Sequence, residues 1–105
     1  MRFGIKTAQV KYISSRVSSV RGQQISIKYM QSDEYKYSVI VSKKQGNAVK
    51  RNRTKRVIRE IMRTKEKFCP AGLYLIYLNG KCDYLDRQKA ISEIEKFAQK
   101  FQKIN

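Results

Sequence analysis

The sequence VSKKQGNAVKRNRTKRVIREIMRTK, residues 41–65, decides the fold. Residues 48–65 contain neither glycine nor proline, and winding them at about 100° per residue gathers their apolar side chains on one side. The members of that side are Thr54, Val57, Ile58 and Ile61. Gly46 and Asn47 supply a turn immediately before the helical stretch. The stretch therefore predicts an amphipathic helix whose apolar side closes a hydrophobic core.

Strands are predicted on both sides of this helix. Residues 35–41 alternate between apolar and polar side chains, and residues 73–78 are apolar on both faces, which is typical of a buried strand. A strand, a helix and a second strand form a βαβ unit, so the two strands run parallel if they share a sheet. Residues 39–41 are also apolar on both faces, which predicts that the first strand lies in the middle of the sheet rather than at its edge.

A further strand and two helices complete the pattern. Residues 25–29 alternate and are separated from residues 35–41 by a polar turn, which predicts two antiparallel strands. Asn79 and Gly80 end the later strand and are also compatible with a hairpin into residues 81–85. Apolar residues at helical spacing predict helices near both ends of the chain, capped by Thr7 and Asp86. Their apolar members are Val10, Ile13 and Val17 in the first, and Ile91, Ile94, Phe97, Ala98 and Phe101 in the second.

The predicted order is helix, two or three strands, helix, strand, helix. It describes an α+β fold, a two-layer sandwich around a mixed sheet. The 105 residues have room for one compact domain, residues 1–105.

The chain has no apolar stretch of the roughly 18 residues that a membrane span needs, and residues 1–6 do not resemble an export signal. We therefore expect a cytoplasmic protein with no membrane partner and with free thiols at Cys69 and Cys82.

Positive charge dominates the composition and is concentrated in one segment. The chain has 24 Lys and Arg against 8 Asp and Glu, a net charge of +16, and 11 of the 24 lie in residues 43–67, where Glu60 and Glu66 are the only acids. It contains no His, and its two Cys cannot complete the four-ligand shell of a structural zinc site. We therefore expect no catalytic residue, no metal site and no cofactor bound by the protein alone.

The predicted helix carries a row of polar and basic side chains opposite its apolar side. Four of them, spaced i, i+4, i+7 and i+11, form what we call the basic stripe, and Lys55 borders it. The basic stripe consists of Asn52, Arg56, Arg59 and Arg63. Guanidinium groups about one turn apart suit phosphate oxygens, and without a polyanion they repel one another. The stripe predicts a nucleic-acid interface, which Lys43 and Lys44 extend past the helix N-terminus.

The motif in this segment resembles that of a known family. Gly-Asn-Ala-Val at residues 46–49, Arg-Asn-Arg at 51–53, Lys-Arg at 55–56 and Arg-Glu at 59–60 are similar to the signature of the bacterial ribonuclease P protein subunit. The resemblance implies an accessory protein that binds a large catalytic RNA and the 5′ leader of precursor tRNA. The catalytic RNA would then remove the leader, and the Mg²⁺ that this reaction needs would be bound mainly to that RNA. The resemblance also implies a monomer in a 1:1 complex with the RNA, and a left-handed crossover between the strands that flank the helix, against the usual rule.

The resemblance further implies which residues contact the catalytic RNA, because in this family the motif helix faces that RNA. These residues are Lys44, Arg51, Asn52, Arg53, Lys55, Arg56, Arg59 and Arg63.

The leader in this family lies in a cleft between the first helix and the sheet. By position, the start of the motif would reach it with Lys43, Arg51 and Asn52. Where the family usually has two Phe four residues apart on the first helix, this chain has Val10 and Ser14. Tyr12 or Tyr29 is then the candidate for stacking on a leader base, while ordinary packing on the sheet is the competing role for each.

Three other functions fit parts of the sequence. A basic ribosomal protein or RNA chaperone would share the charge, size and α+β order, and only the motif in residues 41–60 argues against it. A self-contained protein nuclease is disfavoured because the acids are scattered; the nearest two, Asp83 and Asp86, are explained by a helix cap and a solvated neighbour. A membrane-surface helix is disfavoured because the neighbouring strands need its apolar side.

Overall fold

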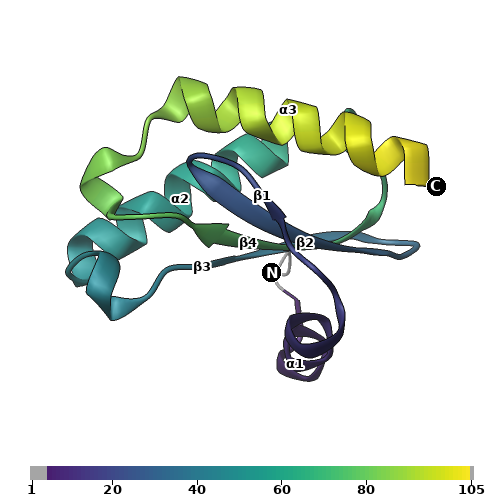
Figure 1. The fold of residues 1–105 in the computed structure, drawn as a ribbon, viewed down its shortest axis with the longest axis horizontal. Coiled ribbons are helices and arrows are strands. Elements are labelled where there is room, and N and C mark those ends of the chain that lie inside the picture. The colour runs from purple at the N-terminus through teal and green to yellow at the C-terminus, as the bar shows by residue number, and fades with distance from the viewer. Residues whose placement is uncertain (1–4, 105) are drawn as a thin grey trace.

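One mixed sheet organises the computed structural model, which describes residues 5–104 (Figure 1). Its strands follow the spatial order β1-β2-β4-β3. The helices are α1 (Thr7–Arg16), α2 (Ala48–Thr64) and α3 (Arg87–Ile104), and the strands are β1 (Val20–Arg21), β2 (Ile25–Gln31), β3 (Tyr35–Ile40) and β4 (Gly72–Leu78). Two short 3-10 helices, η1 (Lys43–Gln45) and η2 (Cys82–Tyr84), precede α2 and α3. The predicted α+β class and order of elements are confirmed, with three strands before the central helix.

The last strand in the sequence is a central strand of the sheet. β4 pairs antiparallel with β2 and parallel with β3, which confirms the predicted parallel pair around α2. β2 and β3 each pair with β4 rather than with one another, so the polar turn between them does not close a hairpin. The prediction that residues 39–41 lie in mid-sheet was wrong, because β3 is an edge strand. Its end is apolar on both faces because Val39 packs under α2 and α3 while Ile40 packs under α1.

Helices cover both faces of the sheet. α2 and α3 lie on one face and α1 lies on the other (Figure 1). The larger core, under α2 and α3, includes Ile27, Tyr74 and Phe101, and the smaller core, under α1, includes Ile13 and Leu75. The predicted two layers therefore describe the sheet with α2 and α3, and α1 adds a third, partial layer.

The motif helix α2 begins and ends close to the predicted limits. Asn47 is its N-cap, and the side-chain oxygen of Asn47 accepts a hydrogen bond from the Lys50 backbone N–H at 2.9 Å. The buried residues of α2 are Thr54, Ile58, Ile61 and Met62, and Val57 is partly buried. At the other end, the Tyr35 hydroxyl donates to the Met62 carbonyl oxygen at 2.6 Å. The helix is therefore fixed against β3, and its basic side is turned away from the sheet.

The ends of the other helices agree with the sequence in part. The N-cap position of α1 is Lys6, one residue before the predicted Thr7, and the Lys6 backbone N–H donates to the Gln9 side chain at 3.3 Å. Asp86 caps α3 as predicted, since its carboxylate accepts from the Lys89 backbone N–H at 3.2 Å. Residues 81–85 contain η2 and form no second hairpin strand.

Both cysteines are buried free thiols, as predicted. Burial raises the pKa of the Cys69 thiol, which keeps it protonated at neutral pH. No helix within residues 5–104 is long and apolar enough to cross a membrane.

Candidate nucleic-acid interface

The basic stripe lies on the outer side of α2. All four of its side chains are exposed, and Lys55 at its border is partly buried. Arg63 is paired with Glu60 at 3.0 Å, whereas Arg56 and Arg59 have no ion-pair or hydrogen-bond partner within residues 5–104. Burial raises the pKa of Tyr37 on β3 while the positive charges of Arg63 and Arg59 oppose the shift. The field of the stripe thus reaches the edge strand, and two of its guanidinium groups are available to a polyanion.

The turn η1 holds Lys43 and Lys44 at the end of the sheet from which α2 starts. Both lysines are exposed. The side-chain amide of Gln45 donates to the carbonyl oxygens of Leu78 and Gly80, each at 2.6 Å. Because these bonds tie η1 to the end of β4, the two lysines have a defined position beside the N-terminus of α2, where backbone N–H groups also favour anions.

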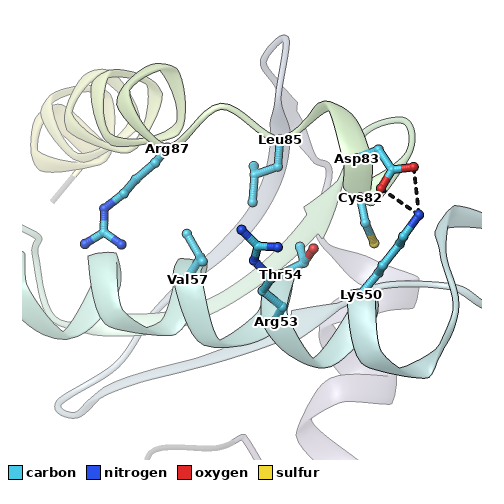
Figure 2. A pocket seen from close by; sticks show the side chains of 8 residues that line it. All are labelled: Lys50, Arg53, Thr54, Val57, Cys82, Asp83, Leu85 and Arg87. Carbon is cyan, nitrogen blue, oxygen red and sulfur yellow. Dashed lines mark hydrogen bonds and ion pairs between the residues drawn. The ribbon is translucent and has the colours of Figure 1, made fainter.

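Arg51 and Arg53 lie on α2 on either side of the basic stripe. Arg51 is partly buried and donates to the Gly46 carbonyl oxygen at 3.1 Å, so it also supports the turn before α2. A Cβ at Gly46 would lie 3.0 Å from the Cys82 sulfur, which explains why the motif has glycine where the turn packs against η2. Arg53 faces η2 and α3, together with Lys50 (Figure 2). The predicted RNA-contacting residues of α2 are therefore spread over three sides of this helix, and Lys44 lies in η1 before it.

A second group of polar side chains lies on the face of the sheet that α1 covers. Lys28 on β2 donates to the Ser14 carbonyl oxygen at 2.6 Å, and its ammonium lies 5.8 Å from the centre of the Tyr77 ring. The hydroxyls of Ser14 and Tyr77 are 3.2 Å apart. Tyr77 pairs with Ile40, the last residue of β3, so this group adjoins the segment that leads into η1. We call Ser14, Lys28 and Tyr77 the α1-face group.

The structure separates the two tyrosines considered for base stacking. Tyr12 on α1 is 51% exposed, and the Arg16 guanidinium lies 5.2 Å from its ring centre. Tyr29 is on the opposite face of the sheet: its ring stacks on Phe101 of α3 at 4.6 Å, and its hydroxyl donates to the Ala71 carbonyl oxygen at 2.7 Å. Tyr29 therefore cannot join α1 in one site and is a packing residue, while Tyr12 remains a candidate.

Tyr77 and Lys28 are not among the residues predicted from the sequence. Residues 73–78 are apolar on both faces, and the sequence does not show which helix covers each face. Alternation along β4 puts Tyr77 on the same side as Leu73 and Leu75, and both of these belong to the core under α1. Once α1 is known to cover that face, the phenol of Tyr77 is the one aromatic group of β4 that faces it.

Comparisons with known proteins agree on one family. The family model described as Ribonuclease P matches residues 5–102. The ribonuclease P protein component of Staphylococcus carnosus is 36% identical in an alignment of length 105 that includes gaps and covers 93% of this chain and 90% of that protein. The solved RNase P protein of Staphylococcus aureus superposes with a TM-score of 0.80 at 24% identity, covering 98% of this chain and 97% of that one. That of Thermotoga maritima gives 0.81 at 19% identity, with 94% and 97% covered.

Proposed function

Because the chain belongs to the ribonuclease P protein family, we propose that it is the accessory subunit that binds the catalytic RNA of a bacterial ribonuclease P and the 5′ leader of precursor tRNA. The RNA cleaves the leader, and no side chain of this protein acts on the reacting phosphodiester. The observation that carries the proposal is the pair Arg56 and Arg59, which are exposed on a rigidly packed helix and have no partner within residues 5–104.

The catalytic RNA is proposed to bind α2 and η1. A guanidinium presents paired donors to phosphate oxygens, and each phosphate contact releases condensed counterions. The net charge of +16 also reduces the repulsion between two polyanions, the catalytic RNA and its tRNA substrate. The proposed contacts are Lys44, Arg51, Asn52, Arg53, Lys55, Arg56, Arg59 and Arg63.

The leader is proposed to run along α1 and the α1-face group. Tyr12 offers an exposed ring for a base, a contact worth about 1 to 3 kcal/mol. Lys28 and Tyr77 lie on the sheet and contact α1 at Ser14. The proposed contacts at the start of the motif are Lys43, Arg51 and Asn52. Val10 packs in the core under α1, and Ser14 bonds to Tyr77, so neither supplies a stacking surface.

The rest of the assembly follows from this role. We propose one protein for each catalytic RNA, working in the cytoplasm. Residues 5–104 hold no group of three or more His, Cys, Asp or Glu suited to a metal ion. The Mg²⁺ that supports cleavage is therefore proposed to bind mainly to the RNA.

The test is single-turnover cleavage of precursor tRNA by a bacterial ribonuclease P RNA at low Mg²⁺, with and without the protein. Low Mg²⁺ leaves the repulsion between the RNAs poorly screened, so the contribution of the protein is largest. Substrates with a long leader and with a one-nucleotide leader are compared. We expect cleavage to be faster with the protein on both substrates, and more so on the long leader.

A pair of tyrosine variants isolates the leader contact. Tyr12→Ala should remove at least about fivefold of the long-leader stimulation and leave the short-leader rate unchanged. Tyr84→Ala is the matched control, since Tyr84 is 73% exposed on η2, away from α1. Equal stimulation of both substrates would refute the leader contact and keep the RNA-subunit role. Absence of stimulation with a matched RNA would refute the accessory role in cleavage and favour a different RNA-binding role, such as that of an RNA chaperone.

A further inference from the structure

A pocket of about 400 Å³ lies between α2, η2 and the start of α3, to one side of the basic stripe (Figure 2). Val57 points into it from α2, and Leu85 points into it from the segment before α3. Both side chains are partly buried. Its volume is within the range of about 300 to 1,000 Å³ that small organic ligands occupy, and these two aliphatic side chains form apolar walls for a flat group.

The charged residues around the pocket are unevenly neutralised. Lys50, at one end, is paired with Asp83 at 2.9 Å (Figure 2). Arg53 and Arg87 extend toward the pocket from α2 and α3, and neither has an acidic or hydrogen-bond partner in the described part of the chain. Three positive groups and one negative group leave the rim at +2. The unneutralised charge of Arg53 and Arg87 therefore favours an anion with several oxygen atoms, such as a phosphate.

The floor of the pocket contains a polar group without a partner. Thr54 is 4% exposed and lines the pocket, and its hydroxyl makes no hydrogen bond within residues 5–104. Because the described residues contain no fully buried side-chain oxygen or nitrogen without a partner, this hydroxyl is open to the pocket, where a ligand atom can bond to it in place of water. Because Thr54 lines the pocket together with Val57 and Leu85, its hydroxyl can bond to the edge of a flat polar ring held between those two side chains.

We propose that this pocket takes up one unpaired nucleotide of the RNA that the protein binds. The phosphate contacts Arg53 and Arg87, the base lies between Val57 and Leu85, and the Thr54 hydroxyl bonds to the edge of the base. The inference rests on the proposed function, because the RNA partner supplies the nucleotide. It goes beyond the basic stripe, which offers exposed charge to phosphates but no enclosed apolar surface for a base.

Equilibrium binding of the full-length protein to a bacterial ribonuclease P RNA tests the proposal. Arg87→Gln should weaken binding at least about fivefold and lower the salt slope by about one unit. Lys89→Gln is the control, because Lys89 loses the same charge from the same turn of α3 without lining the pocket, and it should change affinity less than twofold. Thr54→Val should weaken RNA binding at least threefold while the free protein unfolds at the same or a higher temperature, which a purely structural role for the hydroxyl would not produce.

Methyl NMR of Val57 and Leu85 gives the direct readout. Adenosine 5′-monophosphate should shift both methyl signals through the ring current of its base, inorganic phosphate at equal ionic strength should not, and Arg87→Gln should weaken the nucleotide effect. Equal responses to phosphate and nucleotide would overturn the proposal in favour of a simple anion site. Methyl shifts with the nucleotide, combined with wild-type RNA binding by Arg87→Gln and Thr54→Val, would overturn it in favour of a free nucleotide. If the unmodified protein does not bind the RNA at all, the proposed function itself fails.

Discussion

Neutralising Arg56 or Arg59 should weaken binding of the catalytic RNA by an amount that depends on salt in a defined way. Both side chains are exposed and lack partners within residues 5–104, so Arg56→Gln and Arg59→Gln break no internal contact that the structure describes. Each phosphate contact contributes a salt exponent of about 0.7 to 0.9. One lost contact therefore lowers affinity about fivefold at about 0.15 M salt and about tenfold at about 0.05 M.

The assay is filter binding of the protein to the RNA over this range of salt, with affinity plotted against salt on logarithmic axes. Each single variant should lower the slope by slightly less than one unit, and the double variant should lower it by nearly two. Lys100→Gln, an exposed charge on α3, is the control with the same loss of charge and should leave the slope close to that of the unmodified protein. Arg63 is a less clean choice, because its removal also releases Glu60 from their ion pair.

Two results would refute this reasoning. An unchanged slope in both single variants would exclude the stripe from the interface. An equal loss in Lys100→Gln would mean that only the total charge matters, and not the position of the guanidinium groups on α2.

Two further predictions concern stability. Ile61 is 1% exposed in the core under α2 and α3, so Ile61→Ala should lower the free energy of unfolding in urea by about 2 to 5 kcal/mol; a loss below about 0.5 kcal/mol would mean that α2 packs by another side. Burial raises the pKa of Tyr35 and Tyr74 above the ordinary 10.0, so the unfolded chain releases these protons at a lower pH than the folded protein does. The stability that these groups contribute is complete below about pH 10. Above about pH 10, the free energy of unfolding should fall by about 1.4 kcal/mol per pH unit for each group. Urea unfolding between about pH 9 and 11 measures this decrease, and Tyr35→Phe should make it less steep; an equally steep decrease in that variant would remove Tyr35 as a cause.

The helices and the parallel strand pair could be predicted from the sequence because their signals are local. Residues 48–65 have an uninterrupted helical period, and Asp86 precedes α3 as its cap. The position of β3 in the sheet could not be predicted. Apolar residues on both faces, such as Val39 and Ile40, occur in a central strand, but they also occur in an edge strand that helices cover on both faces. Strand order depends on contacts between segments that are far apart in the sequence. The alternation of apolar and polar residues within one strand does not indicate which strands it pairs with.

The residues of the candidate site also differ in whether the sequence alone could predict them. Arg56 and Arg59 could be found because one helical wheel contains them both. The pairing of Arg63 with Glu60 was not predicted, although both lie on that wheel. Tyr77 joins Ser14 only through packing between α1 and β4, and Arg87 approaches α2 only because α3 crosses it, so both depend on contacts between elements far apart in the sequence. The motif predicts which helix carries the candidate interface, and the tertiary structure determines which residues of other elements lie beside it.

The insertion of β4 between β2 and β3 has a consequence for the order in which the protein folds. During synthesis, β2, β3 and the basic helix all emerge before residues 72–78, the segment with which both long strands pair. Until that segment is available, neither strand can form its main ladder, and α2 has no completed sheet to cover. Contacts this distant in sequence slow folding, because the entropy of closing the loop is lost before the pairing is gained. The newly made chain therefore exposes its most basic segment while still unfolded, and an RNA that binds it at that stage competes with the closing of the sheet.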